Sequence, residues 1–384
     1  MNQTARDRLG QLHHIVSTDG FIAGVSAVAQ LALRTLLPQP YGMRTAERIY
    51  LVEAWSRNRR KSSLPLSTQV EVYRKGFTEE LYYQYGFDRR TDWTEYLTEY
   101  ARRCAKSIND RPEVLENKEL FHEFLHEKGY GEYLPTTFGF IENGTFEGEN
   151  DHTLQEVVER EGKIVCKEVI GGGGSDVYIG EWADDGLILS GKYGTRHDGH
   201  SKLSEFTRAI VTEYCSQASY LDEIYPGSAN TIRILTMNPV GEEPFIAAAS
   251  HRFGSKATGE LDNFAVGGLA TDIDIETGTL SSAASFSWDE HITWHETHPD
   301  TGAQIEGVVV PEWTTITETI CQIARSLPEV RHVGWDVLVT APGEFVFVEG
   351  NHYPNPHIFQ IHEPLLRDTR VKAFYRENNI PIPQ

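Results

Sequence analysis

The sequence is poor in cysteine and lysine and has no long apolar run. Its four cysteines lie far apart, without the CxxC or Cys/His spacing of a metal site: Cys104, Cys166, Cys215 and Cys321. They indicate neither a disulfide framework nor a zinc ribbon, and a cytoplasmic location fits this cysteine usage best. Cys166 lies beside Lys167, but we expect a small buried hydrophobic residue there rather than a reactive thiol.

The most apolar early segment does not predict a membrane anchor. A membrane-spanning helix needs about 18 consecutive apolar residues, and no such run occurs in the sequence. The segment "FIAGVSAVAQLALRTLL" (21–37) contains Gln30 and Arg34, follows a polar start and lacks a small-residue cleavage site. It predicts a buried or amphipathic helix, so we expect a soluble protein without a transmembrane segment.

Acidic residues outnumber basic ones, and their distribution along the chain is uneven. The sequence has 56 acidic and 35 basic residues, of which 11 are lysine, and a formal net charge of −21 at pH 7. A field of this sign repels nucleic acid, which we therefore do not expect as a partner. Residues 1–115 contain 17 basic and 13 acidic residues, whereas the remainder contains 18 basic and 43 acidic residues. This change predicts a domain boundary near residues 110–117.

The first part of the chain predicts a helical domain. In "TAERIYLVEAWSRNRR" (45–60) and "WTEYLTEYARRCAKSI" (93–108), apolar residues recur every three or four positions. Proline and glycine punctuate the sequence between them, and no catalytic constellation is evident in this part. We expect its positive balance to form a solvated face, with an anionic partner or a membrane surface as the alternative.

Further along, strand-like runs alternate with helical patterns. Helical periodicity occurs at 118–129, 152–161, 201–216 and 312–327. Strand-like runs occur at 135–141, 163–170, 176–182, 187–191, 230–238, 245–253, 271–276, 332–340 and 344–351. This order predicts an α+β protein with lobes built on mixed sheets.

The stretch "KEVIGGGGSDVYIG" (167–180) places four glycines between two strand-like runs. A flexible linker would lie among polar residues, so this context favours a hairpin loop. Glycines there allow positive φ and a close approach of backbone N–H groups to phosphates, which a lysine four positions upstream can also reach. The run lacks the GxxxxGK[ST] pattern and leads into a strand, so it is no P-loop. Taken alone, it is equally compatible with a purely structural hairpin.

The segment "GWDVLVTAPGEFVFVEGNHYPNP" (334–356) predicts two adjacent strands joined by "APGE". Asp336 lies on the first strand, while Glu349 and Asn351 end the second strand on a common face, because residues two apart share a side. Two carboxylates and a carboxamide oxygen are hard oxygen ligands of the kind that Mg²⁺ prefers. The alternative is a solvated strand end, but the apolar neighbours indicate burial, and buried acids need a partner.

Several segments, taken in their order along the chain, resemble motifs of the ATP-grasp superfamily. The similarity is carried by Lys118, "KEVIGGGG" (167–174), "TEYCSQ" (212–217), "NTIRILTM" (230–237), "RFG" with "DNFAVGG" (252–268) and "GWDVLVT" with "FVFVEGNHYP" (334–354). The chain resembles the sugar-transfer-associated, glutamate-ligase-related branch over roughly residues 70–366. The resemblance implies two α+β lobes that grip ATP, after a helical N-terminal domain. The domains would be 1–112, a central lobe at 113–212 and a C-terminal lobe at 213–384.

The resemblance also implies roles for single residues. The ATP phosphates would be held by two lysines and the glycine-rich loop: Lys118, Lys167, Gly171, Gly172, Gly173, Gly174 and Ser175. Adenine would lie against Glu213 and Tyr214. The matches to magnesium ligands, with Mn²⁺ as an alternative ion, are Asp336, Glu349 and Asn351. The matches to groups that contact the transferred phosphate or its acceptor are Arg252, Asn263 and, as a further candidate, Arg233.

Some of these residues have plain structural alternatives. Glu213 could be a helix-end charge, Arg233 could pair with an acid, and Asn263 could cap a turn. The segment "HITWHETHPDTG" (291–302) has histidines that would suit general bases, but we expect an exposed insertion without a ligand. The ending "NHYP" (351–354) departs from the "NxxPG"-like ending common in the family, which leaves the size and polarity of the acceptor pocket open.

The resemblance implies an ATP- and Mg²⁺-dependent ligase. It would activate a small-molecule carboxylate as an acyl phosphate and join it to an amine or another nucleophile, in cell-surface glycan or amino-acid-conjugate biosynthesis. The main alternative is a kinase that phosphorylates a sugar or polyol hydroxyl. A second alternative is a non-catalytic nucleotide-binding partner of a glycan-assembly complex, which the retained lysines and metal-ligand matches disfavour. The sequence leaves the substrates and the oligomeric state open.

Overall fold

The computed structural model describes residues 41–58, 62–148, 152–171, 177–183, 186–191, 194–286 and 292–384. They form two compact units, one from residues up to 107 together with 366–384, and one from 108–365. The helix predicted at 21–37 and the loop residues 172–175 lie outside the described residues. The domain limits expected at 112 and 212 stay predictions.

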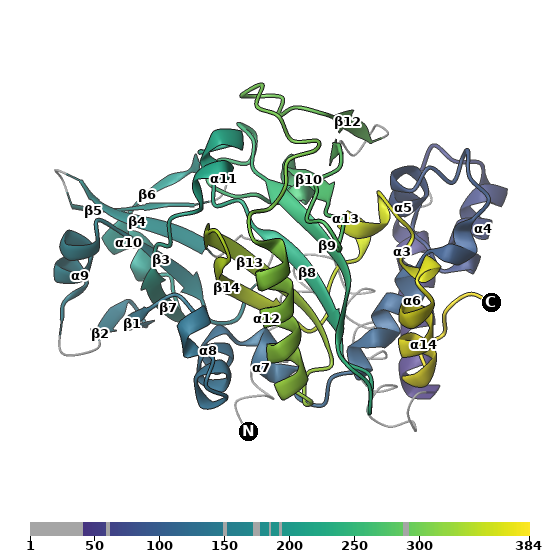
Figure 1. Ribbon diagram of the computed structural model, residues 1–384, viewed down its shortest axis with the longest axis horizontal. Coiled ribbons are helices and arrows are strands. Elements are labelled where there is room, and N and C mark those ends of the chain that lie inside the picture. Colours follow the sequence, from purple (N-terminus) through teal and green to yellow (C-terminus); the bar gives the residue numbers. More distant parts are fainter. Residues whose placement is uncertain are drawn as a thin grey trace. The chain divides into compact units, whose positions relative to one another are not determined.

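The first unit is helical, as predicted. Its helices are α3 (Tyr41–Asn58), α4 (Leu66–Lys75), α5 (Glu79–Gln84), α6 (Glu99–Cys104) and α14 (Thr369–Glu377), with the 3-10 turns η1 (Trp93–Glu95) and η2 (Ala105–Ser107) (Figure 1). Phe77, Tyr85, Phe87 and Tyr96 pack their rings together, with ring centroids of Tyr85 and Tyr96 4.8 Å apart. This aromatic cluster stabilises short helices that would be marginal alone.

The second unit contains a first seven-stranded sheet in the order β2-β1-β7-β3-β4-β5-β6. Its strands are β1 (Thr137–Glu142), β2 (Thr145–Gly148), β3 (Lys163–Glu168), β4 (Val177–Ala183), β5 (Gly186–Ser190), β6 (Arg196–Asp198) and β7 (Arg208–Glu213). The helices α9 (Leu154–Glu161) and α10 (Gly199–Leu203) bury Val157, Val158 and Leu203 against Ile164 and Cys166 of β3. Lys167 follows Cys166, so its side chain lies on the other face of this sheet.

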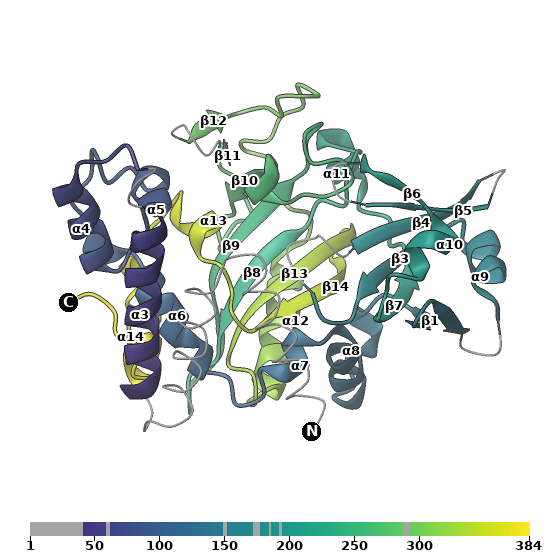
Figure 2. The same ribbon diagram turned by 180° about the vertical axis from the view of Figure 1, so that it is seen from behind.

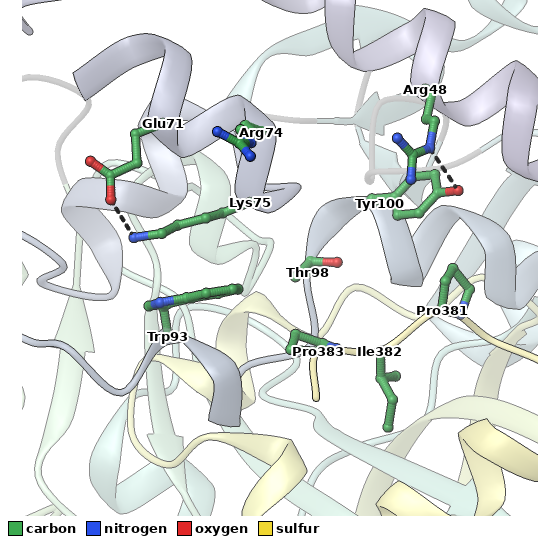
Figure 3. Close-up of a pocket in the computed structure, with 10 residues that line it drawn as sticks. All are labelled: Arg48, Glu71, Arg74, Lys75, Trp93, Thr98, Tyr100, Pro381, Ile382 and Pro383. Atoms are coloured by element: carbon green, nitrogen blue, oxygen red, sulfur yellow. Dashed lines mark hydrogen bonds and ion pairs between the residues drawn. The ribbon is translucent and has the colours of Figure 1, made fainter. Parts of the chain in front are cut away.

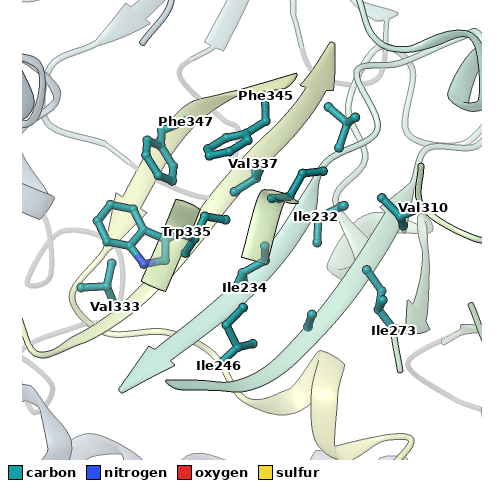
Figure 4. Close-up of a cluster of buried hydrophobic side chains, with 14 of the residues drawn as sticks. Ile232, Ile234, Ile246, Ile273, Val310, Val333, Trp335, Val337, Phe345 and Phe347 are labelled. Atoms are coloured by element: carbon teal, nitrogen blue, oxygen red, sulfur yellow. The ribbon is translucent and has the colours of Figure 1, made fainter. Parts of the chain in front are cut away.

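A second seven-stranded sheet has the order β12-β11-β10-β9-β8-β13-β14. Its strands are β8 (Ile232–Met237), β9 (Phe245–Phe253), β10 (Leu269–Asp272), β11 (Ala283–Ser285), β12 (Thr293–His295), β13 (His332–Ala341) and β14 (Glu344–Asn351). Helix α12 (Trp313–Ser326) lies along one face, as Figures 1 and 2 show from opposite sides. Apolar side chains of this face form the main core, including Ile232, Ile234, Trp335 and Phe347 (Figure 4).

Short elements connect and flank the two sheets. They are α7 (Glu113–Glu116), α8 (Lys118–Glu127), η3 (Gly131–Tyr133), α11 (Ser219–Ile224), η6 (Phe264–Val266), α13 (His357–Gln360) and η7 (Leu365–Arg367). Phe121 and Phe124 of α8 join the core of the second sheet. In the described part of the chain, no helix combines the length and the apolar character that crossing a membrane requires.

Two predictions about the strands are wrong. Every strand pairing in the described residues is antiparallel, so the sheets are not mixed. Strands of one direction, such as β1 and β3, are separated by β7, which runs the opposite way. The helix predicted at 201–216 is the short helix α10 followed by strand β7. As a central strand, β7 is buried on both faces, which produces an apolar run without alternation.

Candidate functional site

Charged side chains gather on the face of the second sheet opposite the main core. Along β8 and β13, the core residues Ile232, Ile234 and Trp335 alternate with Arg233 and Asp336, which therefore point to the other side. Arg233 lies directly opposite Asp336 in the pairing of these strands. On β9, Ser250 lies opposite Arg233, and Arg252 is two residues further along the same face. The predicted hairpin of β13 and β14 is confirmed.

A β-bulge brings Glu349 to this charged face. Asp336 lies opposite Glu349, but the next residue, Val337, lies opposite Phe347, so Val348 is an extra residue in β14. Strict alternation would have put Glu349 on the same face as Phe347, in the apolar core. Beyond the bulge, Asn351 shares the face of Glu349 and donates a hydrogen bond from Nδ2 to its Oε1 (3.3 Å).

Two arginines hold the carboxylate of Asp336. Arg233 donates from Nε to Oδ1 and from Nη2 to Oδ2, the second bond measuring 2.9 Å. Arg252 Nη2 lies 3.2 Å from Oδ2. Burial by itself would raise the pKa of Asp336, but the two guanidinium groups outweigh it and the pKa is lowered. Asp336 is therefore an anion in a site that excludes most water, with 4% of its surface exposed.

Arg252 is anchored by groups that the sequence did not single out. Its Nε donates to Thr231 Oγ1 (3.1 Å) and lies 3.5 Å from Asp262 Oδ2. Asp262 in turn accepts hydrogen bonds from the backbone N (2.8 Å) and Oγ1 (2.5 Å) of Thr231. Burial opposes the charge on Arg252, but Asp262 and Asp336 raise its pKa. This network fixes the direction of the guanidinium plane.

The two candidate lysines reach the same region from the first sheet and from α8. Lys167 Nζ lies 3.4 Å from the backbone oxygen of Val348, to which it donates at the bulge. Burial lowers the pKa of Lys167, while Glu349 opposes the shift. Burial and the neighbouring Asp336 raise the pKa of Glu349, and both Lys118 and Lys167 oppose that rise. The lysines and the acids of the hairpin thus belong to one electrostatic cluster.

Lys118 begins α8 and is tied to the segment that leads into the glycine run. Its backbone N donates to Val169 O (3.0 Å), and its Nζ donates to Gly171 O (3.2 Å). The neighbouring Glu119 accepts two hydrogen bonds from Arg208 of β7, at 2.6 and 2.8 Å. The start of α8 is therefore held by both β7 and the segment that follows β3. Of the glycine-rich loop, only Gly171 lies within the described residues.

Three remaining candidates have clear structural contacts. Glu213 ends β7 and accepts hydrogen bonds at Oε2 from Thr136, at 2.9 Å from its Oγ1. It is not a helix-end charge, because the predicted helix is a strand there. The ring centroid of Tyr214 lies 5.5 Å from Lys163 Nζ. Asn263 caps η6 by accepting from Ala265 N (3.0 Å), so it does cap a turn, whatever further role it has.

The hairpin presents a donor set that suits a magnesium ion. Asp336 and Glu349 face each other across the strands, and Asn351 contacts Glu349. Carboxylate and carboxamide oxygens are hard ligands, and each has lone pairs beyond those that already accept from arginine or asparagine. Among the described residues, no group of three or more His, Cys, Asp and Glu side chains forms a metal site, so the third donor here would be the carboxamide.

Two histidines near the candidate site and in the segment 291–302 lie in the interior. His251 and His298 are 0% exposed. His298 stacks on Tyr225, with ring centroids 4.7 Å apart, and its Nε2 contacts Gly254 O at 2.9 Å. The prediction of an exposed insertion at 291–302 is therefore wrong for His298, because the ring of Tyr225 covers it.

The motifs and the fold point to one protein family. The model of the sugar-transfer associated ATP-grasp family matches residues 98–373, which include both sheets and every candidate site residue. The chain belongs to this family. A comparison with curated protein sequences gave no significant match.

Solved ATP-grasp enzymes share a remote likeness with this family member. D-alanyl-alanine synthetase A from Vibrio cholerae is 10% identical, with a TM-score of 0.35, over 68% of this chain and 66% of that one. Biotin carboxylase from Campylobacter jejuni is 11% identical, with a TM-score of 0.40, over 74% of this chain and 53% of that one. The ATP-grasp ligase PsnB, solved with Mg and ADP, is 15% identical, with a TM-score of 0.33, over 69% of this chain and 60% of that one. At these levels the likeness carries no information on substrates.

Sequence reasoning missed the residues that support the candidate site. Asp262 and Thr231 stand next to Asn263 and Ile232 in the quoted motifs, but nothing local shows that they would meet Arg252. Arg208 lies in the segment that was predicted as a helix, so its contact with Glu119 was not foreseen. The only signal for these residues was their nearness in sequence to motif positions.

Proposed function

We propose that the chain is an ATP- and Mg²⁺-dependent ligase that activates a carboxylate as an acyl phosphate and joins it to an amine or another nucleophile. The observation that carries the proposal is the contact between Lys167 of the first sheet and Val348 of the second, beside Glu349. It joins the lysines expected at the ATP phosphates and the acids expected at the metal in one cluster. Two lobes that meet around one anion are what phosphoryl transfer requires.

The charge of the cluster supports an anionic ligand. Four basic side chains, Lys118, Lys167, Arg233 and Arg252, meet three acids, Asp262, Asp336 and Glu349. Residues 116–384 as a whole contain 18 basic and 43 acidic residues, so a local excess of basic groups stands out. In a site that excludes water, these cations stabilise negative charge more strongly than surface groups would.

The reaction divides the work among these residues. A substrate carboxylate oxygen attacks the γ-phosphorus of ATP, the bond to the bridging oxygen breaks, and ADP leaves. Lys118 and Lys167 stabilise the charge on the phosphoryl oxygens. The amine nitrogen then attacks the acyl carbon, phosphate leaves with the bonding electrons, and the nitrogen loses a proton. When bound by Asp336, Glu349 and Asn351, Mg²⁺ would neutralise phosphate charge.

The arginines favour a carboxylate over a hydroxyl as the acceptor. Arg233 and Arg252 hold the carboxylate of Asp336, and this contact supports a carboxylate as the kind of group that they would recognise. A planar guanidinium matches a carboxylate with two parallel hydrogen bonds, whereas a neutral hydroxyl offers no such partner. The family description, sugar-transfer associated, supports substrates from cell-surface glycan or amino-acid-conjugate synthesis.

Trapping the acyl phosphate tests the proposal. The purified chain would be incubated with Mg·ATP, hydroxylamine and a panel of amino acids, uronic acids and carboxylated cell-envelope precursors. We expect equal amounts of ADP, phosphate and acyl hydroxamate with at least one acid. Asp336→Asn should lower turnover by about 100-fold or more, because one of the charges that preorganise the site is lost.

A matched control and a binding measurement complete the experiment. Lys167→Met should weaken Mg·ADP binding in calorimetry by about tenfold, whereas Lys202→Met, on α10, should leave it unchanged. Formation of ADP together with a phosphorylated acceptor, without free phosphate, would establish the kinase in place of the ligase. Full turnover in Asp336→Asn would contradict the assignment of the hairpin.

A further inference from the structure

The helical unit contains a cavity that is lined by cations and rings. Its lining residues come from four separate stretches of the chain: Arg48, Glu71, Arg74, Lys75, Trp93, Thr98, Tyr100, Pro381, Ile382 and Pro383. Figure 3 shows Lys75 and Trp93 on one side, Arg48 and Tyr100 on the other, and the C-terminal residues below. All of these residues belong to the first compact unit, whereas every candidate site residue of the ligase lies in the second.

Two of the three cations in this cavity have no carboxylate partner in the described part of the chain. Lys75 is paired with Glu71, with 2.6 Å between Nζ and Oε1. Among the described residues, Arg48 interacts with Tyr100, through a hydrogen bond of 3.4 Å to Oη and through the ring. In the described residues, Arg74 has no ion-pair or hydrogen-bond partner. In a chain with a net charge of −21, a cavity with two uncompensated guanidinium groups is suited to an anion.

The geometry of the wall keeps these cations in place. Lys75 Nζ lies 4.9 Å from the ring centroid of Trp93, and Arg48 Cζ lies 5.2 Å from that of Tyr100. Such cation–π contacts restrict the side chains and reduce the entropy lost on binding. Gly76 ends α4 with a φ of 91°, and a Cβ there would lie 3.1 Å from Tyr100 Cβ, so the glycine lets α4 approach α6 closely.

The C-terminal residues line one side of the cavity and are themselves anchored. Arg44 Nη2 donates to Asn379 O (2.7 Å), and Ile380, which is 5% exposed, donates from its backbone N to Tyr375 O (2.8 Å). The rings of Pro381 and Pro383 and the indole of Trp93 give the cavity flat apolar surfaces. Its volume of about 610 Å³ is larger than a free phosphate needs and falls among small-molecule sites.

We propose that this cavity binds a small organic anion with a ring-shaped body, whose phosphate or carboxylate pairs with Arg48 and Arg74 and whose ring lies against Trp93 and the prolines. Guanidinium groups recognise both kinds of anion through the same paired donors. The inference does not rest on the ligase chemistry, because none of these residues belongs to the candidate site.

Calorimetric titration of the full chain at low salt tests the inference. The ligands would be glucose 6-phosphate, glucuronate, inorganic phosphate and uncharged glucose, so that the phosphate and carboxylate forms are compared directly. We expect glucose 6-phosphate or glucuronate to bind at least about tenfold more tightly than glucose. Arg48→Gln and Arg74→Gln should each weaken that binding by about tenfold. Trp93→Ala should weaken the binding of the sugar anion but not the binding of inorganic phosphate.

Controls separate this site from folding and from the nucleotide. Arg57→Gln, on the same helix as Arg48 but outside the cavity, should leave the affinity unchanged. The thermal midpoint and Mg·ADP affinity of the cavity variants should equal those of the wild type. The inference is overturned if both sugar anions fail to bind at about 1 mM, if glucose binds equally well, or if Arg48→Gln and Arg74→Gln bind as the wild type does.

Discussion

His251 shows what burial does to a single titratable residue in the second sheet. It lies on β9 with 0% of its surface exposed, stacks on Phe253 with ring centroids 4.5 Å apart, and shares a hydrogen bond of 3.1 Å with Tyr220 Oη. Burial lowers its pKa to about 3, and the charge of Arg252 adds to the shift. A histidine in the unfolded chain has a pKa near 6.5. Below that pH, His251 is therefore protonated in the unfolded chain but stays neutral in the folded chain.

His251 should therefore make the protein less stable in mild acid. Its contribution is present above about pH 6.5 and is lost as the pH falls, by up to about 1.4 kcal/mol per pH unit, until the folded pKa is reached. Urea unfolding of the wild type and of His251→Gln between pH 7 and 5 checks this. The stability advantage of the wild type should shrink with falling pH. Parallel curves for the two proteins would refute the expectation.

At the scale of secondary-structure elements, β14 depends on a glycine between two candidate metal ligands. Gly350 lies opposite Trp335 and follows Glu349. A Cβ on Gly350 would lie 2.7 Å from Leu115 Cδ2 and 2.9 Å from Phe121 Cε2, both of which are buried. The glycine thus allows α7 and α8 to pack directly on the strand, which in turn positions Lys118 at the start of α8.

Gly350→Ala should destabilise the protein by overpacking. We expect a loss of about 1 to 3 kcal/mol in the free energy of unfolding, measured with urea. The same substitution made in Leu115→Ala should cost less than it does in the wild type, because the nearer of the two clashes is removed while the one with Phe121 remains. An equal cost in the two backgrounds would mean that the packing of α7 on β14 is not the cause.

At the scale of the whole molecule, the chain returns to its first unit at the end. Residues 366–384 belong with the N-terminal helices, although some 260 residues of the second unit lie between them in sequence. Phe374 and Tyr375 of α14 are each 1% exposed. Arg367 adds ion pairs with Asp92 (3.1 Å) and Glu95 (2.5 Å). The helical unit is therefore completed only after the rest of the chain.

Phe374→Ala should weaken the helical unit selectively. Removing this buried ring should cost about 3 to 5 kcal/mol, and hydrogen exchange should accelerate in the helices between residues 44 and 104. Strands β8 and β13 should keep their protection, because their core lies in the other unit. Arg376→Ala, an exposed change on the same helix, serves as the comparison. Uniform loss of protection in both units would show that they do not unfold separately.

Much of the fold follows from local patterns. The helices at 118–127, 154–161 and 313–326 have the periodicity that the sequence predicted, and the two apolar runs joined by "APGE" predicted the hairpin of β13 and β14. Strand β7 was missed because its four central residues are all buried, so apolar and polar residues do not alternate along it. The antiparallel order also depends on which strands become neighbours, and no single segment contains that information.

The residue types of the candidate site were evident from the sequence, whereas their contacts were not. The order of the motifs and the chemistry of their residues can be read from the sequence alone. They were enough to name Asp336, Glu349, Asn351, Arg233, Arg252 and both lysines. Only the tertiary structure decided that a bulge at Val348 turns Glu349 away from the core, and that Asp336 is held by two arginines. It also decided that the C-terminal residues line a cavity of the helical unit. Local sequence sets helix periodicity and strand alternation, but these contacts join residues far apart in the chain, and burial of the whole molecule selects them.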